Sequence, residues 1–261
     1  MLRSVLFIPC ANAKVMAKAA TLQCDALIFD LEDAVGDAER DGALARLAKT
    51  LAGSFVSKMV LVRIHPQYLG GIHKALSGLH IDGLVIPKVS SAADISGVAH
   101  VWPHVPLWAM VETAQGMVNL PKIAAAGVKG LIAGPNDLRK DLRTRPMEGR
   151  ADILFALSQI VLYGRANDLI VLDGVYNQYT DEVGFTAECA QGRSLGFDGK
   201  TLIHPAQSAA CEAAFSPSEA EIAWASAVVT AFEGSSAGVM SVNGEMVERL
   251  HLEQARRILG K

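Results

Sequence analysis

The sequence lacks an excess of basic residues, and this absence argues against nucleic acid as a partner. Its 24 Lys and Arg residues nearly balance its 27 Asp and Glu residues, so the formal net charge is -3 and the isoelectric point is about 6.2. Such a chain has no general electrostatic attraction for phosphate polymers or anionic membranes. We therefore expect no nucleic-acid partner and no membrane partner.

Long apolar runs and paired cysteines are also missing. No run approaches the roughly 18 to 20 residues that span a bilayer, and the opening run Val5-Leu6-Phe7-Ile8 is too short for a signal-peptide core. We expect a cytoplasmic protein. The four cysteines lie far apart without a C-x-x-C pair, which argues against a disulfide framework and against a zinc site.

What the sequence does contain is a regular alternation of short apolar runs with stretches of helical period. This alternation indicates βα units around a parallel sheet, and a chain of 261 residues with 51% hydrophobic residues can bury one large core. The predicted strands are residues 4–8, 26–30, 60–64, 83–86, 107–111, 130–133, 169–172 and 199–203. Strands each followed by a helix favour a closed (β/α)8 TIM barrel, an α/β fold, over an open sheet.

The helices predicted between and after these strands are residues 13–20, 37–51, 70–77, 92–99, 119–125, 152–167, 186–195, 205–213 and 217–232. We assign residues 1–233 to the barrel domain. Residues 234–261 are predicted to form a hinge and a short C-terminal tail that ends in an amphipathic helix. Because this tail has little core of its own, we expect it to dock on its own barrel or on a neighbouring subunit.

Polar residues that follow the apolar runs are the candidates for chemistry, because reactive groups of a TIM barrel lie at the C-terminal ends of its strands. Glu112 and Asp137 follow adjacent strands, so we expect their carboxylates to lie side by side. Two carboxylates completed by water suit Mg2+. A helix cap or a salt bridge is about as probable for either acid alone. The further rim candidates are Asp30, Glu32, Asp33, Arg63, Lys88, Asn136, Asp173 and His204.

Arg63 closes an apolar strand, so its guanidinium can point into the barrel mouth and hold a substrate carboxylate through two hydrogen bonds. The alternative is a structural partner for the acids Asp30, Glu32 and Asp33, and both roles can hold at once. We expect these acids to hold metal-bound waters and basic side chains from behind the metal, although a loop cap is nearly as probable. Lys88 is expected to face the cavity or the solvent.

The same residues, in this order, carry a resemblance to the citrate lyase β-subunit-like (HpcH/HpaI aldolase/citrate lyase) family. This family includes CoA-thioester lyases such as malyl-CoA and citramalyl-CoA lyase. The matching segments span nearly the whole chain and are RSVLFIP (3–9), DLEDAV (30–35), VRI (62–64), PK (87–88), ET (112–113), GPNDL (134–138), GFDGKTLIHP (196–205) and GEMVER (244–249).

The resemblance implies Mg2+, with Mn2+ as a possible substitute, held by Glu112 and Asp137. It implies a substrate bound by Arg63, Glu112 and a segment made of Gly134, Pro135 and Asn136. It also implies a homotrimer or hexamer in which an Asp of the tail reaches a neighbouring active site. Glu248 stands at that position here, and with Arg63 it is the expected catalytic residue. Cys10 and His65 also depart from the family pattern.

The expected activity is reversible carbon–carbon cleavage of a 3-hydroxyacyl-CoA thioester, such as malyl-CoA, citramalyl-CoA or a citryl thioester, into an acetyl thioester and a keto acid. Two alternatives remain open. The chain can be the lyase subunit of a citrate lyase complex that acts on an acyl-carrier-protein thioester. It can also be a keto-acid-binding homologue in which Glu248 has weakened catalysis, because a displacement of about 1 Å can cost on the order of a hundredfold in rate.

Overall fold

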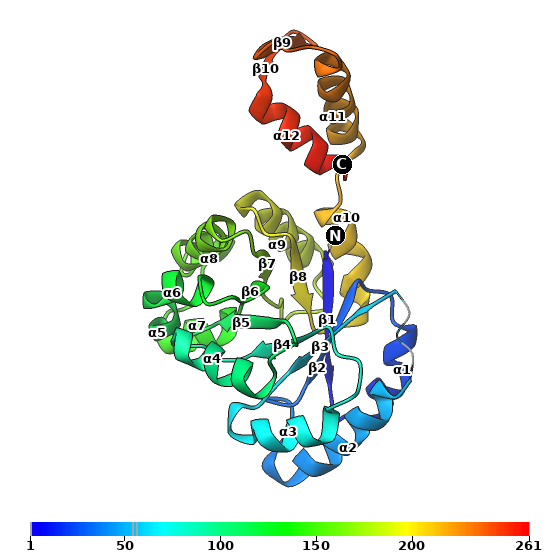
Figure 1. Cartoon of the computed structure of the whole chain (residues 1–261), viewed down its shortest axis with the longest axis vertical. Coiled ribbons are helices and arrows are strands. Elements are labelled where there is room, and N and C mark those ends of the chain that lie inside the picture. Colours follow the sequence, from blue (N-terminus) through cyan, green and yellow to red (C-terminus); the bar gives the residue numbers. More distant parts are fainter. Residues whose placement is uncertain (1, 54, 56, 261) are drawn as a thin grey trace. The chain divides into compact units, whose positions relative to one another are not determined.

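Eight parallel strands form a closed barrel in the computed structural model, which describes residues 2–53, 55 and 57–260 (Figure 1). Each strand pairs with the next along the chain, and the last pairs with the first. The strands are β1 (Ser4–Pro9), β2 (Ala26–Asp30), β3 (Met59–Arg63), β4 (Gly83–Ile86), β5 (Leu107–Val111), β6 (Gly130–Ala133), β7 (Ile170–Asp173) and β8 (Gly199–Leu202). The predicted (β/α)8 barrel is confirmed, with every strand end within one residue of its predicted place.

Helices connect successive strands and surround the barrel (Figure 1). They are α1 (Ala13–Lys18), α2 (Arg40–Leu51), α3 (Leu69–Leu76), α4 (Ala92–Val101), α5 (Ala114–Val118), α6 (Leu120–Ala124), α7 (Pro135–Leu142), α8 (Leu154–Ala166), α9 (Glu182–Leu195) and α10 (Ser208–Phe215). The sequence did not predict α5 or α7, which are short helices directly after β5 and β6. In the described part of the chain, no helix has both the length and the apolar character needed to cross a membrane.

Side chains of each strand alternate between the barrel interior and the surrounding helices. Met110 belongs to the apolar cluster inside the barrel, whereas Val111 belongs to the cluster between barrel and helices. Glu112 comes two residues after Met110 and therefore continues the inward row at the C-terminal end of β5. Arg63 continues the inward row of β3 in the same way, two residues after Leu61. The pleat of the strands thus delivers charged groups to the barrel mouth.

The last part of the chain forms a second compact unit, Ser216–Lys261, with its own apolar cluster. It contains α11 (Glu219–Phe232), β9 (Val239–Val242), β10 (Glu245–Glu248) and α12 (Arg249–Ile258). The sequence placed the boundary near residue 233 and expected little core beyond it. The structure instead groups α11 with the tail, because Val228 and Phe232 of α11 pack with Val247 and Leu252.

A β-hairpin lies in the second unit, within the segment that was predicted to be a short tail before the final helix. β9 and β10 pair antiparallel through the two-residue loop Asn243-Gly244. Both loop residues have positive φ angles, 51° and 84°. This is the geometry of a type I′ turn, for which Asn-Gly is the preferred sequence.

Candidate functional site

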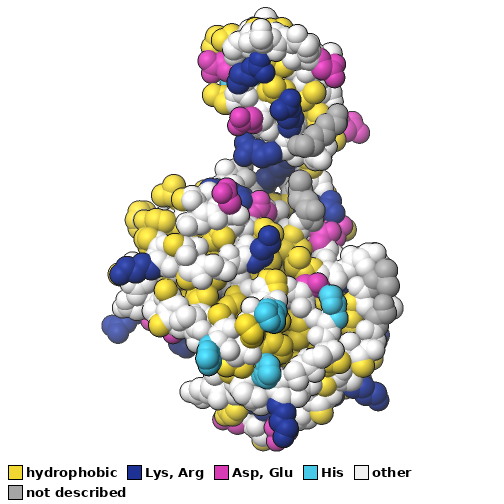
Figure 2. All heavy atoms as spheres, in the orientation of Figure 1, with side chains coloured by type: hydrophobic (Ala, Val, Ile, Leu, Met, Phe, Trp, Pro, Cys, Tyr) yellow, Lys and Arg dark blue, Asp and Glu magenta, His cyan; other side chains and the backbone are white. Residues whose placement is uncertain are grey.

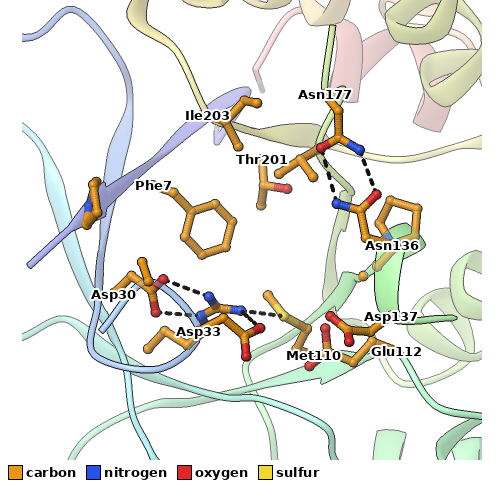
Figure 3. Close-up of a pocket in the computed structure, with 17 residues that line it drawn as sticks. Phe7, Asp30, Asp33, Met110, Glu112, Asn136, Asp137, Asn177, Thr201 and Ile203 are labelled. Atoms are coloured by element: carbon orange, nitrogen blue, oxygen red, sulfur yellow. Dashed lines mark hydrogen bonds and ion pairs between the residues drawn. The ribbon is translucent and has the colours of Figure 1, made fainter. Parts of the chain in front are cut away.

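A cavity of about 360 Å3 opens at the C-terminal ends of the strands (Figure 3). Asp30, Arg63, Glu112 and Asp137 line it together with Phe7 and Met110 from the barrel interior. Gly134, Pro135 and Asn136 also line it, whereas Glu32 and Lys88 do not. The structure therefore brings together most of the residues singled out in the sequence.

Glu112 is the most deeply buried acid that lines this cavity, with 2% of its surface exposed. The pKa of its carboxyl is raised from 4.5 to about 7, mainly by burial and to a smaller extent by the charges of Asp137 and Glu32. The backbone N–H of Lys88, which donates to Glu112 Oε1 at 2.7 Å, and the charge of Arg63 act in the opposite direction. A buried carboxylate of this kind favours a nearby cation.

Asp137 is the third residue of α7 and lines the same cavity (Figure 3). The helix can begin beside Glu112 because Gly134, the residue before it, has no side chain: a Cβ there would overlap the Glu112 carboxylate. Among the described residues, no group of three or more His, Cys, Asp or Glu side chains is arranged to hold a metal ion. A cation at Glu112 and Asp137 would therefore keep water or substrate oxygens as its remaining ligands, which suits Mg2+.

Arg63 is held mainly by acids of the rim. Its Nε and Nη2 each donate to Asp30 at 2.7 Å, and its Nη1 lies 3.1 Å from Glu32 Oε2. Burial opposes the charge of Arg63, but the bonds to Asp30 keep its pKa above the ordinary value. The two-pronged edge predicted to hold a substrate carboxylate is thus occupied by Asp30, the residue beside Arg63 in the β2–β3 register. These contacts are those of the structural role considered for Arg63, and its contact with a substrate stays a prediction.

Lys88, Glu32 and Asp33 form the outer part of this cluster. Lys88 Nζ donates to Glu32 Oε1 and, at 2.9 Å, to Asp33 Oδ1. Lys88 and Glu32 line a separate, neighbouring cavity with Arg40 and His65. The expectation that the acids hold basic side chains agrees with these contacts.

The rim carries more negative than positive charge. The cations at the cavity and its border are Arg63 and Lys88. The carboxylates there are Asp30, Glu32, Asp33, Glu112 and Asp137, which gives an excess of three negative charges when all of these groups are ionised. In the described chain, neither Glu112 nor Asp137 pairs directly with Lys or Arg. Buried charge is costly unless it is paired, so this imbalance favours a bound divalent cation.

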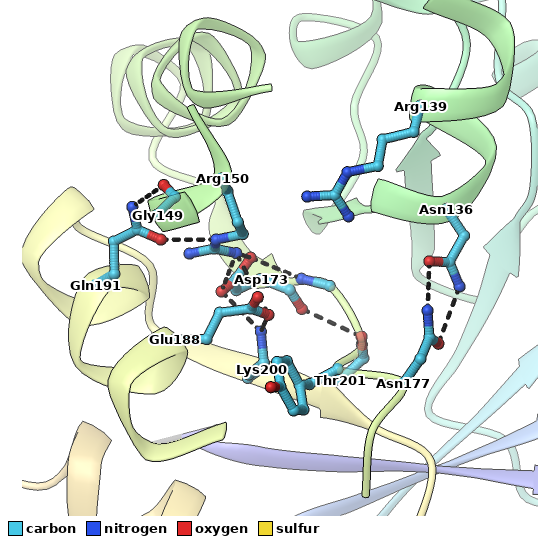
Figure 4. A network of polar contacts seen from close by, with 12 residues as sticks. Asn136, Arg139, Gly149, Arg150, Asp173, Asn177, Glu188, Gln191, Lys200 and Thr201 are labelled. Atoms are coloured by element: carbon cyan, nitrogen blue, oxygen red, sulfur yellow. Dashed lines mark hydrogen bonds and ion pairs between the residues drawn. The ribbon is translucent and has the colours of Figure 1, made fainter. Parts of the chain in front are cut away.

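Asn136 and Asn177 join the two sides of the cavity rim through a reciprocal pair of amide hydrogen bonds (Figure 4). Their donor-to-acceptor distances are 3.1 and 2.8 Å. Asn177 and Thr201 line the cavity but were missed in the sequence. Strand alternation could have revealed Thr201, which is paired in register with the inward residue Val5. No local pattern marks Asn177.

Two rim candidates lie away from the cavity. Asp173 points outward from β7, because the preceding residue Leu172 already faces the barrel interior. It is completely buried among polar partners (Figure 4): Arg150 Nη1 donates to it at 2.8 Å and Lys200 Nζ at 3.0 Å. His204 is exposed and stacks on Tyr179. Both are structural groups here.

Glu248 lies in the second unit, as the residue that precedes α12. Its backbone N–H donates to His251 Nδ1 at 2.8 Å, which ties the end of β10 to the first turn of the helix. Its expected action in a neighbouring subunit stays a prediction.

The fold and the cavity together define a (β/α)8-barrel protein with an acidic site at the C-terminal end of the barrel. The chain belongs to the HpcH/HpaI aldolase/citrate lyase family, whose model matches residues 3–205. The family resemblance inferred from the sequence motifs is thereby confirmed.

Individual relatives cover nearly the whole chain. A (3S)-malyl-CoA thioesterase of Cereibacter sphaeroides is 45% identical over 267 residues, which are 99% of this chain and 94% of the relative. A citrate lyase subunit beta-like protein of Deinococcus radiodurans is 34% identical and covers 99% of this chain and 96% of its own. Protein CitE of Mycobacterium tuberculosis, solved with magnesium, acetoacetate and coenzyme A, aligns with a TM-score of 0.85 at 29% identity, covering 99% and 97%.

The raised pKa of Glu112 predicts how stability depends on pH in the metal-free protein. The folded state keeps a proton on Glu112 up to about pH 7, whereas the unfolded chain loses it near pH 4.5. The stability that this proton contributes is complete below pH 4.5 and is lost as pH rises to 7. Urea unfolding with a chelator present should show this loss in the wild type relative to Glu112→Gln. Equal pH dependence in both proteins would contradict the assignment.

Asp173→Asn should destabilise the protein strongly, because it leaves Arg150 and Lys200 buried with less compensating charge. We expect a loss of about 3–5 kcal/mol in the free energy of unfolding, as for other broken buried ion pairs. Asp37→Asn is the matched control: its side chain is 88% exposed in an ion pair with Arg40, and such pairs contribute about 1 kcal/mol or less. Denaturant titration of both variants measures the difference, and similar losses would refute this ranking.

Proposed function

We propose that this protein is a Mg2+-dependent enzyme that cleaves or forms the carbon–carbon bond of a malyl-CoA-type thioester. The observation that carries the proposal is the pair Glu112 and Asp137, two carboxylates in one cavity without a Lys or Arg partner among the described side chains. The complexes of CitE with magnesium, acetoacetate and coenzyme A, and with magnesium and pyruvate, support the choice of metal and substrate class. Mn2+ has similar ligand preferences and is expected to substitute.

The residues present fit the metal. Glu112 and Asp137 supply the hard oxygen ligands that Mg2+ prefers, and the cavity leaves room for water and substrate oxygens. When bound, Mg2+ would act as a Lewis acid that stabilises negative charge on the substrate's oxygens. The excess of carboxylates at the rim explains why the free carboxylate of such a thioester would need a cation in order to enter.

The protein's own residues would orient the acid end of the substrate. Arg63 is fixed by its bonds to Asp30, so its positive charge needs little rearrangement when negative charge develops nearby. Nε and Nη2 are bonded to Asp30, whereas Nη1 lies 3.1 Å from Glu32 and 3.8 Å from the Met110 sulfur. We therefore assign Nη1 to binding the substrate. Phe7 and Met110 give this part of the cavity an apolar wall that excludes water.

In the cleavage direction, the hydroxyl group of the substrate gives its proton to water, and the bond between the hydroxyl-bearing carbon and the adjacent methylene breaks. The electron pair passes to the thioester side, which takes up a proton and leaves as acetyl-CoA, while the acid end leaves as glyoxylate. Glu248 of a neighbouring copy is our proposal for the group that delivers this proton. The family resemblance, in which an Asp occupies this position, supports that assignment.

Thioester hydrolysis is the second candidate. A relative with 45% identity over almost the whole chain is a (3S)-malyl-CoA thioesterase, and it shares the malyl-CoA substrate class with the lyase proposal. Hydrolysis would consume water and release malate and free CoA, with no change in the carbon skeleton. The two activities are distinguished by their products. The expected homotrimer or hexamer stays a prediction.

The metal assignment predicts that Glu112→Gln and Asp137→Asn abolish Mg2+-dependent turnover of malyl-CoA. Loss of several kcal/mol of charge stabilisation corresponds to a decrease of at least about a hundredfold in kcat/KM. The assay follows acetyl-CoA and glyoxylate by chromatography, with malate and free CoA measured in parallel. Malate and CoA alone would replace the lyase proposal with hydrolysis. Wild-type rates in both variants, with folding unchanged by circular dichroism, would refute the metal site.

The proposed role of Glu248 predicts complementation between inactive subunits. Glu112→Gln and Glu248→Gln proteins should each be inactive as lyases, but mixing them after partial denaturation should recover activity, because some sites then combine an intact Glu112 with an intact Glu248. Each variant refolded alone is the control. A mixture as inactive as its components would contradict action from a neighbouring copy.

A further inference from the structure

The two carboxylates of the proposed metal site come from separate segments that are joined outside the cavity. Glu112 follows β5, and Asp137 lies in α7, which follows β6. Asp141, one helical turn after Asp137, accepts the backbone N–H of Ala114 through its Oδ2 at 2.5 Å. Ala114 is the first residue of α5 and comes two residues after Glu112. This hydrogen bond therefore connects the two metal-binding segments directly.

We propose that Asp141 is a positioning residue that fixes the separation of the Glu112 and Asp137 carboxylates. The inference rests on the proposed divalent-cation site and deepens it. Asp141 itself is exposed and does not line the cavity, so it is not a ligand. Because it acts on the segment that follows Glu112, its loss changes the geometry of the ligand pair without removing a ligand.

The hydrogen bond from Ala114 to Asp141 is placed so that it can fix the turn that follows Glu112. Ala114 begins a short helix, so its N–H has no partner within that helix, and an ionised carboxylate is a strong acceptor for such a group. Thr113, the residue between Glu112 and Ala114, uses its own hydroxyl to accept the N–H of Gly116 at 2.9 Å. The whole turn from Glu112 to Gly116 is thereby held in one conformation.

Helix α7, which carries the acceptor Asp141, is also held rigidly. α7 buries Leu138 completely, and Arg139 Nε donates to Asp152 at 2.7 Å. At the start of the helix, Pro135 packs so closely on Gly174 that a Cβ at Gly174 would overlap its ring. Asp141 therefore tethers the Glu112 turn to a helix that is itself fixed. Groups of this kind behind a metal ligand commonly affect metal affinity by about 10- to 100-fold.

The test measures Mg2+ binding by calorimetry on the full-length protein, without substrate. Asp141→Ala should weaken Mg2+ binding by on the order of tenfold. Asp141→Asn keeps an acceptor oxygen and should retain most of the affinity. Glu148 is exposed and lies, like Asp141, in the segment between β6 and β7. Glu148→Gln removes one negative charge from this segment and should bind Mg2+ as the wild type does. These variants separate the hydrogen bond from the net charge.

Ala114→Pro removes the same hydrogen bond from the donor side. Proline is tolerated at the first position of a helix, and the preceding residue Thr113 has the extended conformation that proline requires (φ -131°, ψ 152°). The affinity loss should match that of Asp141→Ala, and the double variant should lose no more than either single one. The melting temperatures of these variants in chelator should stay close to that of the wild type. A purely structural role of the hydrogen bond would instead lower the melting temperature and leave the Mg2+ affinity unchanged.

Wild-type Mg2+ affinity in Asp141→Ala would overturn the inference and leave the proposed function standing. Equal losses in Asp141→Asn and Asp141→Ala would assign the effect to charge and would overturn it as well. No Mg2+ binding by the wild-type protein would refute the metal site itself, and the positioning role with it.

Discussion

The unequal pairing of buried charge at the barrel mouth is the constraint on which the site depends. Arg63 compensates Asp30 and shares Glu32 with Lys88, and these contacts use up the positive side chains of the cluster. In the described chain, Glu112 is left with the backbone N–H of Lys88 as its hydrogen-bond partner and with a carboxyl whose pKa is raised by burial. Protein interiors tolerate such a group when it is protonated or when a cation is bound. The raised pKa of Glu112 favours the first condition in the metal-free protein, and a cation at Glu112 and Asp137 would meet the second.

Much of the fold and the central part of the site could be predicted from the sequence. Apolar runs of the right length and spacing identified every barrel strand, because parallel strands buried on both faces are continuously apolar. Arg63 and Glu112 were found because they end such runs. Asp173 ends one too, yet it faces the helices. Counting strand positions in twos from Leu172 would have separated it from the cavity residues, since alternation fixes the direction of each side chain.

Other features depend on contacts that a local pattern does not contain. α7 has a mostly polar sequence in which Leu138 is the only fully buried leucine, so no apolar stripe predicts it. Its position follows from Gly134, Gly174 and Asp141, which contact residues far away along the chain. The hairpin of the second unit is a different case, because Asn243-Gly244 is a strong local signal that was overlooked in a segment interpreted as a tail.

The independent apolar cluster of the second unit has a consequence for how members of such a family can diverge. Val228, Val247 and Leu252 pack among themselves, so the unit has an apolar core of its own, separate from the cluster that fills the barrel. Substitutions on the surface of this unit can therefore accumulate without disturbing the packing of the barrel interior. A recombination point near Ser216 would exchange this unit between homologues as an intact building block.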